Sequence, residues 1–84
     1  MGSKVSRQQF LSAAAANGNA ETFFQAVSAD KADPNWIQYN SAVCISNTDS
    51  LASLYQVLFG LDDMDMIEFF QQAAKLPGGN KSCN

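Results

Sequence analysis

The chain of 84 residues is long enough for one small domain, and its 46% hydrophobic content indicates a folded core rather than disorder. Five basic and eight acidic residues give a net charge of −3, which is the wrong sign for holding the phosphate backbone of nucleic acids. The sequence has no histidine, so the usual general base and imidazole metal ligands are missing. We therefore expect no enzymatic activity, no cofactor and no metal.

Apolar residues recur at helical spacing between turn signals along most of the chain. Gly18 is expected to end the first helix and Gly60 the fourth, because glycine readily adopts the left-handed conformation that ends a helix. Asn19 is expected to cap the second helix, and Asp62 the last one. The pattern predicts helices over residues 6–16, 20–29, 51–59 and 63–76.

The segment from Trp36 to Ile45 is the one ambiguous stretch, because its β-branched and aromatic residues also suit a strand. We expect a third helix there. The predicted fold is all-α, a compact bundle of four to five short helices that forms a single domain over residues 6–77. Residues 1–5 and 78–84 are expected to be flexible ends.

The two cysteines, Cys44 and Cys83, do not have the spacing of a metal site or a disulfide framework. We interpret them as free thiols in a reducing compartment, while a single disulfide stays open if the tail folds back. No apolar stretch is long enough to span a membrane, and the N-terminus lacks the pattern of a secretory signal. These features predict a cytoplasmic protein.

A weak internal repeat aligns residues 11–18 with residues 43–50, at an offset of 32 positions. The first unit carries the leucine, the paired alanines and the inter-helix glycine of an ankyrin repeat, at Leu11, Ala14, Ala15 and Gly18. Residues 10–59 thus resemble a degenerate pair of ankyrin repeats, which implies two helix pairs followed by a C-terminal helix. The second unit departs from the pattern, because Cys44 replaces the histidine and Ser50 replaces the glycine.

Nine aromatic side chains are a large number for a chain of this length. The adjacent pairs Phe23-Phe24 and Phe69-Phe70 cannot both point inward on one narrow helical face, so some aromatic surface should lie at an interface; the alternative is a wide buried face. We predict a small non-enzymatic protein–protein interaction module of the adaptor or inhibitor type. Its partner would be another protein or a second copy of the chain. The expected partner-binding residues are Trp36, Tyr39, Phe24 and Phe70.

Two other functions remain open. Asp49-Ser50-Leu51 resembles the signature of acyl and peptidyl carrier proteins, in which the serine carries phosphopantetheine at the start of a helix. The glycine that usually precedes this signature is absent, and helix capping also explains the tripeptide.

Gly2 and Ser6 fit the N-myristoylation pattern, which would imply a peripheral membrane adaptor; the alternative is a chance match. A membrane is expected as a partner only if Gly2 is acylated.

Overall fold

The computed structural model describes residues 3–83, and this part of the chain contains five α-helices, one two-stranded sheet and a short 3₁₀ turn. The helices are α1 (Arg7–Ala16), α2 (Ala20–Ser28), α3 (Pro34–Ser41), α4 (Ser50–Leu58) and α5 (Asp63–Ala74). The strands are β1 (Lys4–Ser6) and β2 (Cys44–Ser46), and the 3₁₀ turn is η1 (Lys81–Cys83). The predicted helical bundle is confirmed, with the small sheet as an addition. No helix in residues 3–83 is long and apolar enough to cross a membrane.

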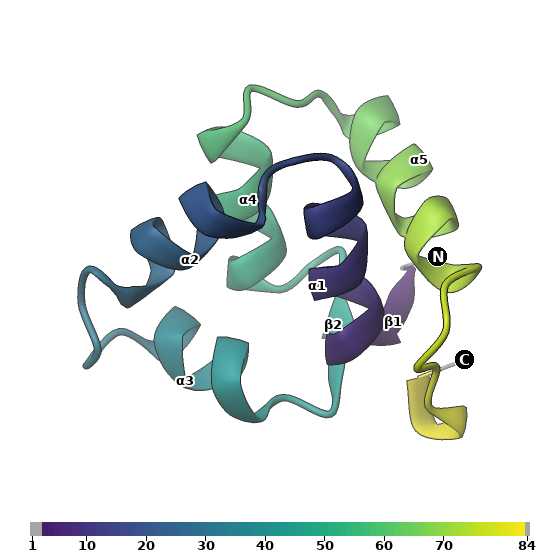
Figure 1. Ribbon diagram of the computed structural model, residues 1–84, viewed down its shortest axis with the longest axis horizontal. Coiled ribbons are helices and arrows are strands. Elements are labelled where there is room, and N and C mark those ends of the chain that lie inside the picture. Colours follow the sequence, from purple (N-terminus) through teal and green to yellow (C-terminus); the bar gives the residue numbers. More distant parts are fainter. Residues whose placement is uncertain (1–2, 84) are drawn as a thin grey trace.

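Helix α1 lies at the centre of the molecule, and the other elements surround it (Figure 1). It packs against α2 and α5, and it also contacts both strands. Its sequence suits this position, since the small side chains of Ala13 and Ala14 let neighbouring elements approach closely while Phe10 fills the space between them. All three side chains are fully buried.

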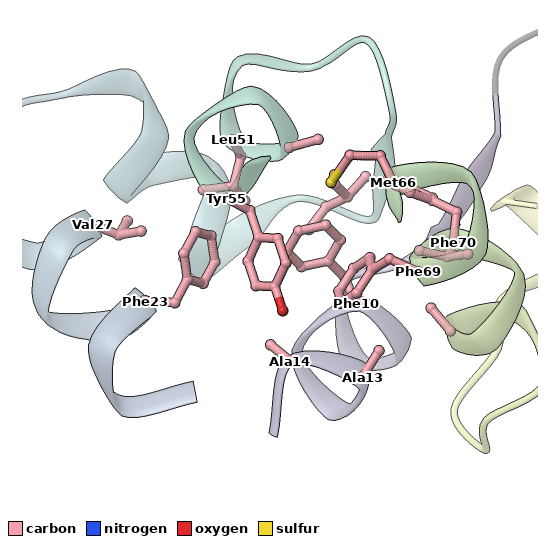
Figure 2. Packing of buried hydrophobic residues seen from close by; sticks show 14 residues of the cluster. Phe10, Ala13, Ala14, Phe23, Val27, Leu51, Tyr55, Met66, Phe69 and Phe70 are labelled. Carbon is pink, nitrogen blue, oxygen red and sulfur yellow. The ribbon is translucent and has the colours of Figure 1, made fainter. Parts of the chain in front are cut away.

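The core is an aromatic cluster around Phe10 (Figure 2). The centroid of the Phe10 ring lies between 5.1 and 5.8 Å from the centroids of Phe23, Tyr55, Phe69 and Phe70. The contacts with Tyr55, Phe69 and Phe70 are edge to face, the arrangement that the charge distribution of aromatic rings favours. Because the five rings come from α1, α2, α4 and α5, a single cluster joins four helices.

Side-chain caps fix where α1 and α5 begin. The Ser6 hydroxyl accepts from the backbone N–H of Gln9, and the Gln9 side chain accepts from the backbone N–H of Ser6, which together form a capping box. Asp62 begins an equivalent box at α5, as the sequence predicted. Asn19 was also expected to cap α2, but its side chain makes no such bond, and its amide donates to the Tyr55 hydroxyl at 3.0 Å.

The segment predicted as a helix from Trp36 to Ile45 is only partly helical. Helix α3 ends at Ser41, and Cys44–Ser46 forms strand β2. The two strands pair antiparallel with Val5 opposite Ile45, and both side chains are buried. The helical prediction was wrong for β2 because this strand depends on a partner at the other end of the chain, which local residue spacing does not reveal.

The two ends of the described chain are paired and bonded, in contrast to the flexible ends predicted from the sequence. Residues 4–6 form β1, and the chain after α5 returns to the same end of the molecule, where β1 contacts η1 (Figure 1). A disulfide joins Cys44 to Cys83, with the two Cα atoms 5.4 Å apart. The interpretation of two free thiols was therefore wrong.

The two segments aligned as an internal repeat have different secondary structures. Residues 11–16 belong to α1, whereas the aligned residues 43–48 contain β2 and the turn before α4. The resemblance to ankyrin repeats rests on the residue pattern alone and stays a prediction.

Candidate functional site

Helix α3 lies at the edge of the molecule, against α2 and α4 (Figure 1). It begins at Asp33, whose side chain accepts from the backbone N–H of Asn35 at 2.8 Å. Pro34 occupies the first turn, where a backbone N–H would have no helical partner in any case. None of the eight residues of α3 is buried. The aromatic side chains of α3 therefore lie at the edge of the core, where they are partly exposed.

Three of the four predicted partner-binding residues come together on α2 and α3. Phe24, Trp36 and Tyr39 form one group, which we call the aromatic surface. The ring centroids of Trp36 and Tyr39 lie 6.0 Å apart with nearly parallel planes, and the Phe24 centroid lies 5.9 Å from each of them. Trp36 and Tyr39 are three positions apart in α3, so one helical turn brings both rings to the same face.

The aromatic surface is accessible to solvent while it remains attached to the core. The side chain of Phe24 is 44% exposed, and that of Ile37, also on α3, is 58% exposed; Trp36 and Tyr39 are half-buried. The Tyr39 ring lies 5.9 Å from the ring of Phe23, which is fully buried. This contact orients the surface rings in advance, which reduces the entropy that would be lost on binding a partner.

Charged residues lie beside the aromatic surface, in the turn between α2 and α3. The ammonium group of Lys31 lies 5.7 Å from the centre of the Trp36 ring, within range of a cation–π interaction. Asp30 and Asp33 belong to the same turn and line a hollow of about 150 Å³ between α2 and Leu54 of α4. The aromatic surface thus has positively and negatively charged residues at its edge, and protein interfaces commonly have such a polar rim.

Phe70 does not belong to the aromatic surface. Its side chain is 1% exposed, and its ring centroid lies 5.8 Å from that of Phe10 and 5.9 Å from that of Phe69. Phe69 is also buried, so α5 presents the wide buried face that the sequence left as an alternative. The assignment of Phe70 to partner binding is corrected accordingly, because its ring forms part of the core.

Ser50, the modified residue of the carrier hypothesis, is the first residue of α4 and is exposed. The side chain of Asp49 does not cap this helix, although capping was one explanation of the tripeptide. Its carboxylate accepts instead from the backbone N–H of Ser46 at 2.8 Å and from the Gln38 amide at 2.7 Å. Asp49 thus ties the loop before α4 to α3. Gly2, the acylation candidate, lies outside the described residues.

Lys31 and Ile37 also belong to the region of the aromatic surface, although the sequence pattern did not indicate them as binding residues. Ile37 follows Trp36 directly, and its exposure depends on which face of α3 turns toward α2. Lys31 reaches the Trp36 ring because of the path that the chain takes between α2 and α3, which residue spacing does not define.

Comparisons with known proteins identify no relative. No protein-family model matches the chain, and no curated protein or solved structure matches it.

Proposed function

We propose that the protein is a small non-enzymatic interaction module that binds another protein through the aromatic surface, in the manner of an adaptor or an inhibitor. The observation that carries this proposal is the grouping of Phe24, Trp36 and Tyr39 on the outer pair of helices, with no residue of α3 buried. Large aromatic side chains that pack into a partner contribute much of the binding free energy of protein interfaces.

Trp36 is the expected anchor of the interface. It contacts both the exposed cation of Lys31 and the ring of Tyr39, so a partner that covers it would lie close to the cation–π contact. Anchors of this type cost about 2 kcal/mol or more when they are truncated to alanine. A loss of that size weakens binding by roughly thirtyfold.

A second copy of the chain is the simplest partner. In a twofold dimer the same patch meets itself, so the patch has to be self-complementary. The aromatic surface offers groups for such a contact, because rings can pack against rings and Lys31 belongs to the same turn as Asp30 and Asp33. The proposal therefore favours a homodimer.

Light-scattering mass across a concentration series tests the proposal. Wild type is compared with Trp36→Ala and with Val57→Ala, a matched control that trims a 79% exposed apolar side chain on α4, outside the aromatic surface. Circular dichroism of each variant verifies that helical content is unchanged. We expect a wild-type dimer that Trp36→Ala dissociates and that Val57→Ala leaves intact. A monomer at every concentration would refute self-association through this surface.

A carrier function at Ser50 is the second candidate. The observation in its favour is the exposed position of Ser50 as the first residue of α4, where a prosthetic arm would have room. The intact mass is measured after incubation with a phosphopantetheinyl transferase and its cofactor donor, for wild type and for Ser50→Ala. A mass increase that Ser50→Ala abolishes would support this function, and an unchanged wild-type mass would end it.

The disulfide bears both on the predicted cytoplasmic location and on the alternative of an acylated membrane adaptor. The cytoplasmic expectation rested on free thiols, whereas a Cys44–Cys83 disulfide is typical of an oxidising compartment. An adaptor acylated on Gly2 would work at the reducing cytoplasmic face of a membrane, so the disulfide counts against it. If Gly2→Ala released the protein from cell membranes, the acylated adaptor would return as the better proposal.

A further inference from the structure

Four of the five basic residues lie at one end of the molecule. This basic end consists of β1, the start of α1 and the chain after α5, which come together in Figure 1. Neither residues 3–20 nor residues 69–83 contain an aspartate or a glutamate, so the positive charges at this end have no acidic residue in their own segments. The four residues are Lys4, Arg7, Lys75 and Lys81.

Asp49 lies near Lys4, because its carboxylate accepts from the backbone N–H of Ser46, which lies opposite Lys4 in the sheet. The acidic cluster of α5 lies farther from the tail. Asp62, Asp63, Asp65 and Glu68 surround the start of α5, whereas Lys75 follows its last residue. A helix of 12 residues is ~18 Å long, while charges at physiological salt are screened beyond ~8 Å. The acidic cluster at the start of α5 therefore has little effect on an anion close to the end of this helix.

A polar hollow of about 320 Å³ opens at the basic end, between the start of α1, the end of α3 and the returning tail. None of its lining residues is acidic. The Ser6 hydroxyl donates to the Gly78 carbonyl at 2.7 Å, and the disulfide places Cys83 beside β2, so the tail forms a fixed wall. Gly78 has a φ of 94°, and a Cβ atom there would come within 2.5 Å of the Gln8 side chain. The lining residues are Ser6, Arg7, Gln8, Ser41, Ala42, Val43, Gly78, Gly79 and Asn80.

The groups that line this hollow include several hydrogen-bond donors and one permanent positive charge. Among its lining residues, Arg7 carries a guanidinium, and Gln8 and Asn80 carry side-chain amides. The other basic residues all lie within three positions of a lining residue, since Lys4 precedes Ser6, Lys75 precedes Gly78, and Lys81 follows Asn80. A group with several acceptor oxygens and a negative charge fits these donors.

We infer that the hollow binds a phosphate group, with Arg7 as its principal contact. The planar fork of the guanidinium can donate to two phosphate oxygens at once, and the remaining oxygens can accept from the Gln8 and Asn80 amides. A carboxylate offers only two oxygens and a single charge, so it would use fewer of these donors. This site shares no residue with the aromatic surface, and it does not depend on the proposed interaction function.

The phosphate could belong to a soluble phosphate ester or to the headgroup of a phospholipid, and both present the same chemistry to Arg7. The first arm of the test is an NMR titration of the disulfide-bonded protein with inorganic phosphate, at an ionic strength held constant with chloride. We expect amide shifts confined to residues 6–8, 41–43 and 78–80. Acetate under the same conditions should bind several-fold more weakly.

Charge variants test whether phosphate binding depends on Arg7. Arg7→Gln removes one positive charge from the hollow, and Lys31→Gln removes one from the turn between α2 and α3, as a matched control. Asn80→Asp keeps the acceptor for the Ser82 backbone N–H and adds a negative charge to the hollow. We expect about tenfold weaker phosphate binding for Arg7→Gln and Asn80→Asp and no more than about a twofold change for Lys31→Gln. Equal effects of Arg7→Gln and Lys31→Gln would overturn the assignment.

The second arm distinguishes the source of the phosphate. Vesicles of phosphatidylcholine with and without phosphatidylglycerol are sedimented with wild type and with Arg7→Gln. Binding that requires phosphatidylglycerol and Arg7 would identify a lipid headgroup, whereas a phosphate response in solution without vesicle binding would identify a soluble ester. Either result supports the site. No response to phosphate at residues 6–8 and 78–80, together with no Arg7-dependent vesicle binding, would overturn it.

Discussion

Cys44 in β2 is bonded to Cys83 near the end of the chain, across a separation of 39 residues. Cys44 also lies opposite Ser6 in the sheet, so this one position joins the first strand, the second strand and the tail. In a domain of this size the core alone supplies only a small stability, so such a link has a large share in holding the fold together.

Reduction of the disulfide should lower the free energy of unfolding by about 4 kcal/mol. The estimate comes from the loop-closure entropy that a link across 39 residues removes from the unfolded chain. Urea unfolding of the oxidised protein, the reduced protein and the Cys44→Ala/Cys83→Ala variant measures this loss. A decrease below about 1 kcal/mol would mean that the tail is held by its other contacts.

The adjacent pair Phe23 and Phe24 should respond very differently to truncation. Phe23 is fully buried and contacts Phe10, so Phe23→Ala should cost about 3 to 5 kcal/mol of stability. Phe24 is 44% exposed, and Phe24→Ala should cost less than about 1 kcal/mol in the monomer. Chemical denaturation at low protein concentration makes the comparison. Similar losses for the two variants would place Phe24 in the core and remove it from the aromatic surface.

Gln9 should be one of the most sensitive polar positions. Its side chain is 2% exposed, and its amide donates to the carbonyls of Ala74 and Leu76 at 3.3 and 3.0 Å, at the end of α5. Gln9→Ala leaves these carbonyls without that donor and should cost about 1 to 3 kcal/mol. The neighbouring Gln8 is exposed, so Gln8→Ala should change stability by no more than about 0.5 kcal/mol. Thermal unfolding of the two variants, measured side by side, gives the two losses of stability. Equal losses would contradict this prediction.

Stability should fall at high pH because of Tyr55. Burial raises the pKa of Tyr55 above its ordinary value of 10.0, and the hydrogen bond from Asn19 opposes this in part. The unfolded chain therefore loses the phenolic proton first, so this contribution to stability is complete below pH 10.0 and is lost as the pH rises through the folded-state pKa. Tyr55→Phe should flatten the decline of stability above pH 10.0 relative to wild type. An unchanged slope would show that Tyr55 does not cause it.

The helices could be predicted because their signals are local. Glycines with positive φ stand after α1 and after α4, at Gly18 and Gly60, as expected from their place in the sequence. The Asp62 cap of α5 is equally local. The strand pair and the disulfide could not be predicted in this way, since each joins segments that lie at opposite ends of the sequence.

The candidate site was found in part because adjacent aromatic residues on a helix point in different directions. This reasoning holds for Phe24, which lies at the surface while Phe23 is buried. It fails for Phe70, because α5 packs closely on α1 and buries both members of its pair. Which aromatic side chain faces outward therefore depends on how each helix packs against its neighbours, and the sequence pattern does not contain that information.

Trp36 is the single tryptophan of the chain, so its fluorescence reports directly on whether a partner covers the aromatic surface. The measurement is its fluorescence emission as the protein is diluted from high concentration. The account predicts emission at shorter wavelength in the concentrated dimer and a shift to longer wavelength on dilution, in parallel with the fall in mass. The same transition should persist in Val57→Ala. Emission that does not change with concentration, together with a constant monomer mass, would contradict the account.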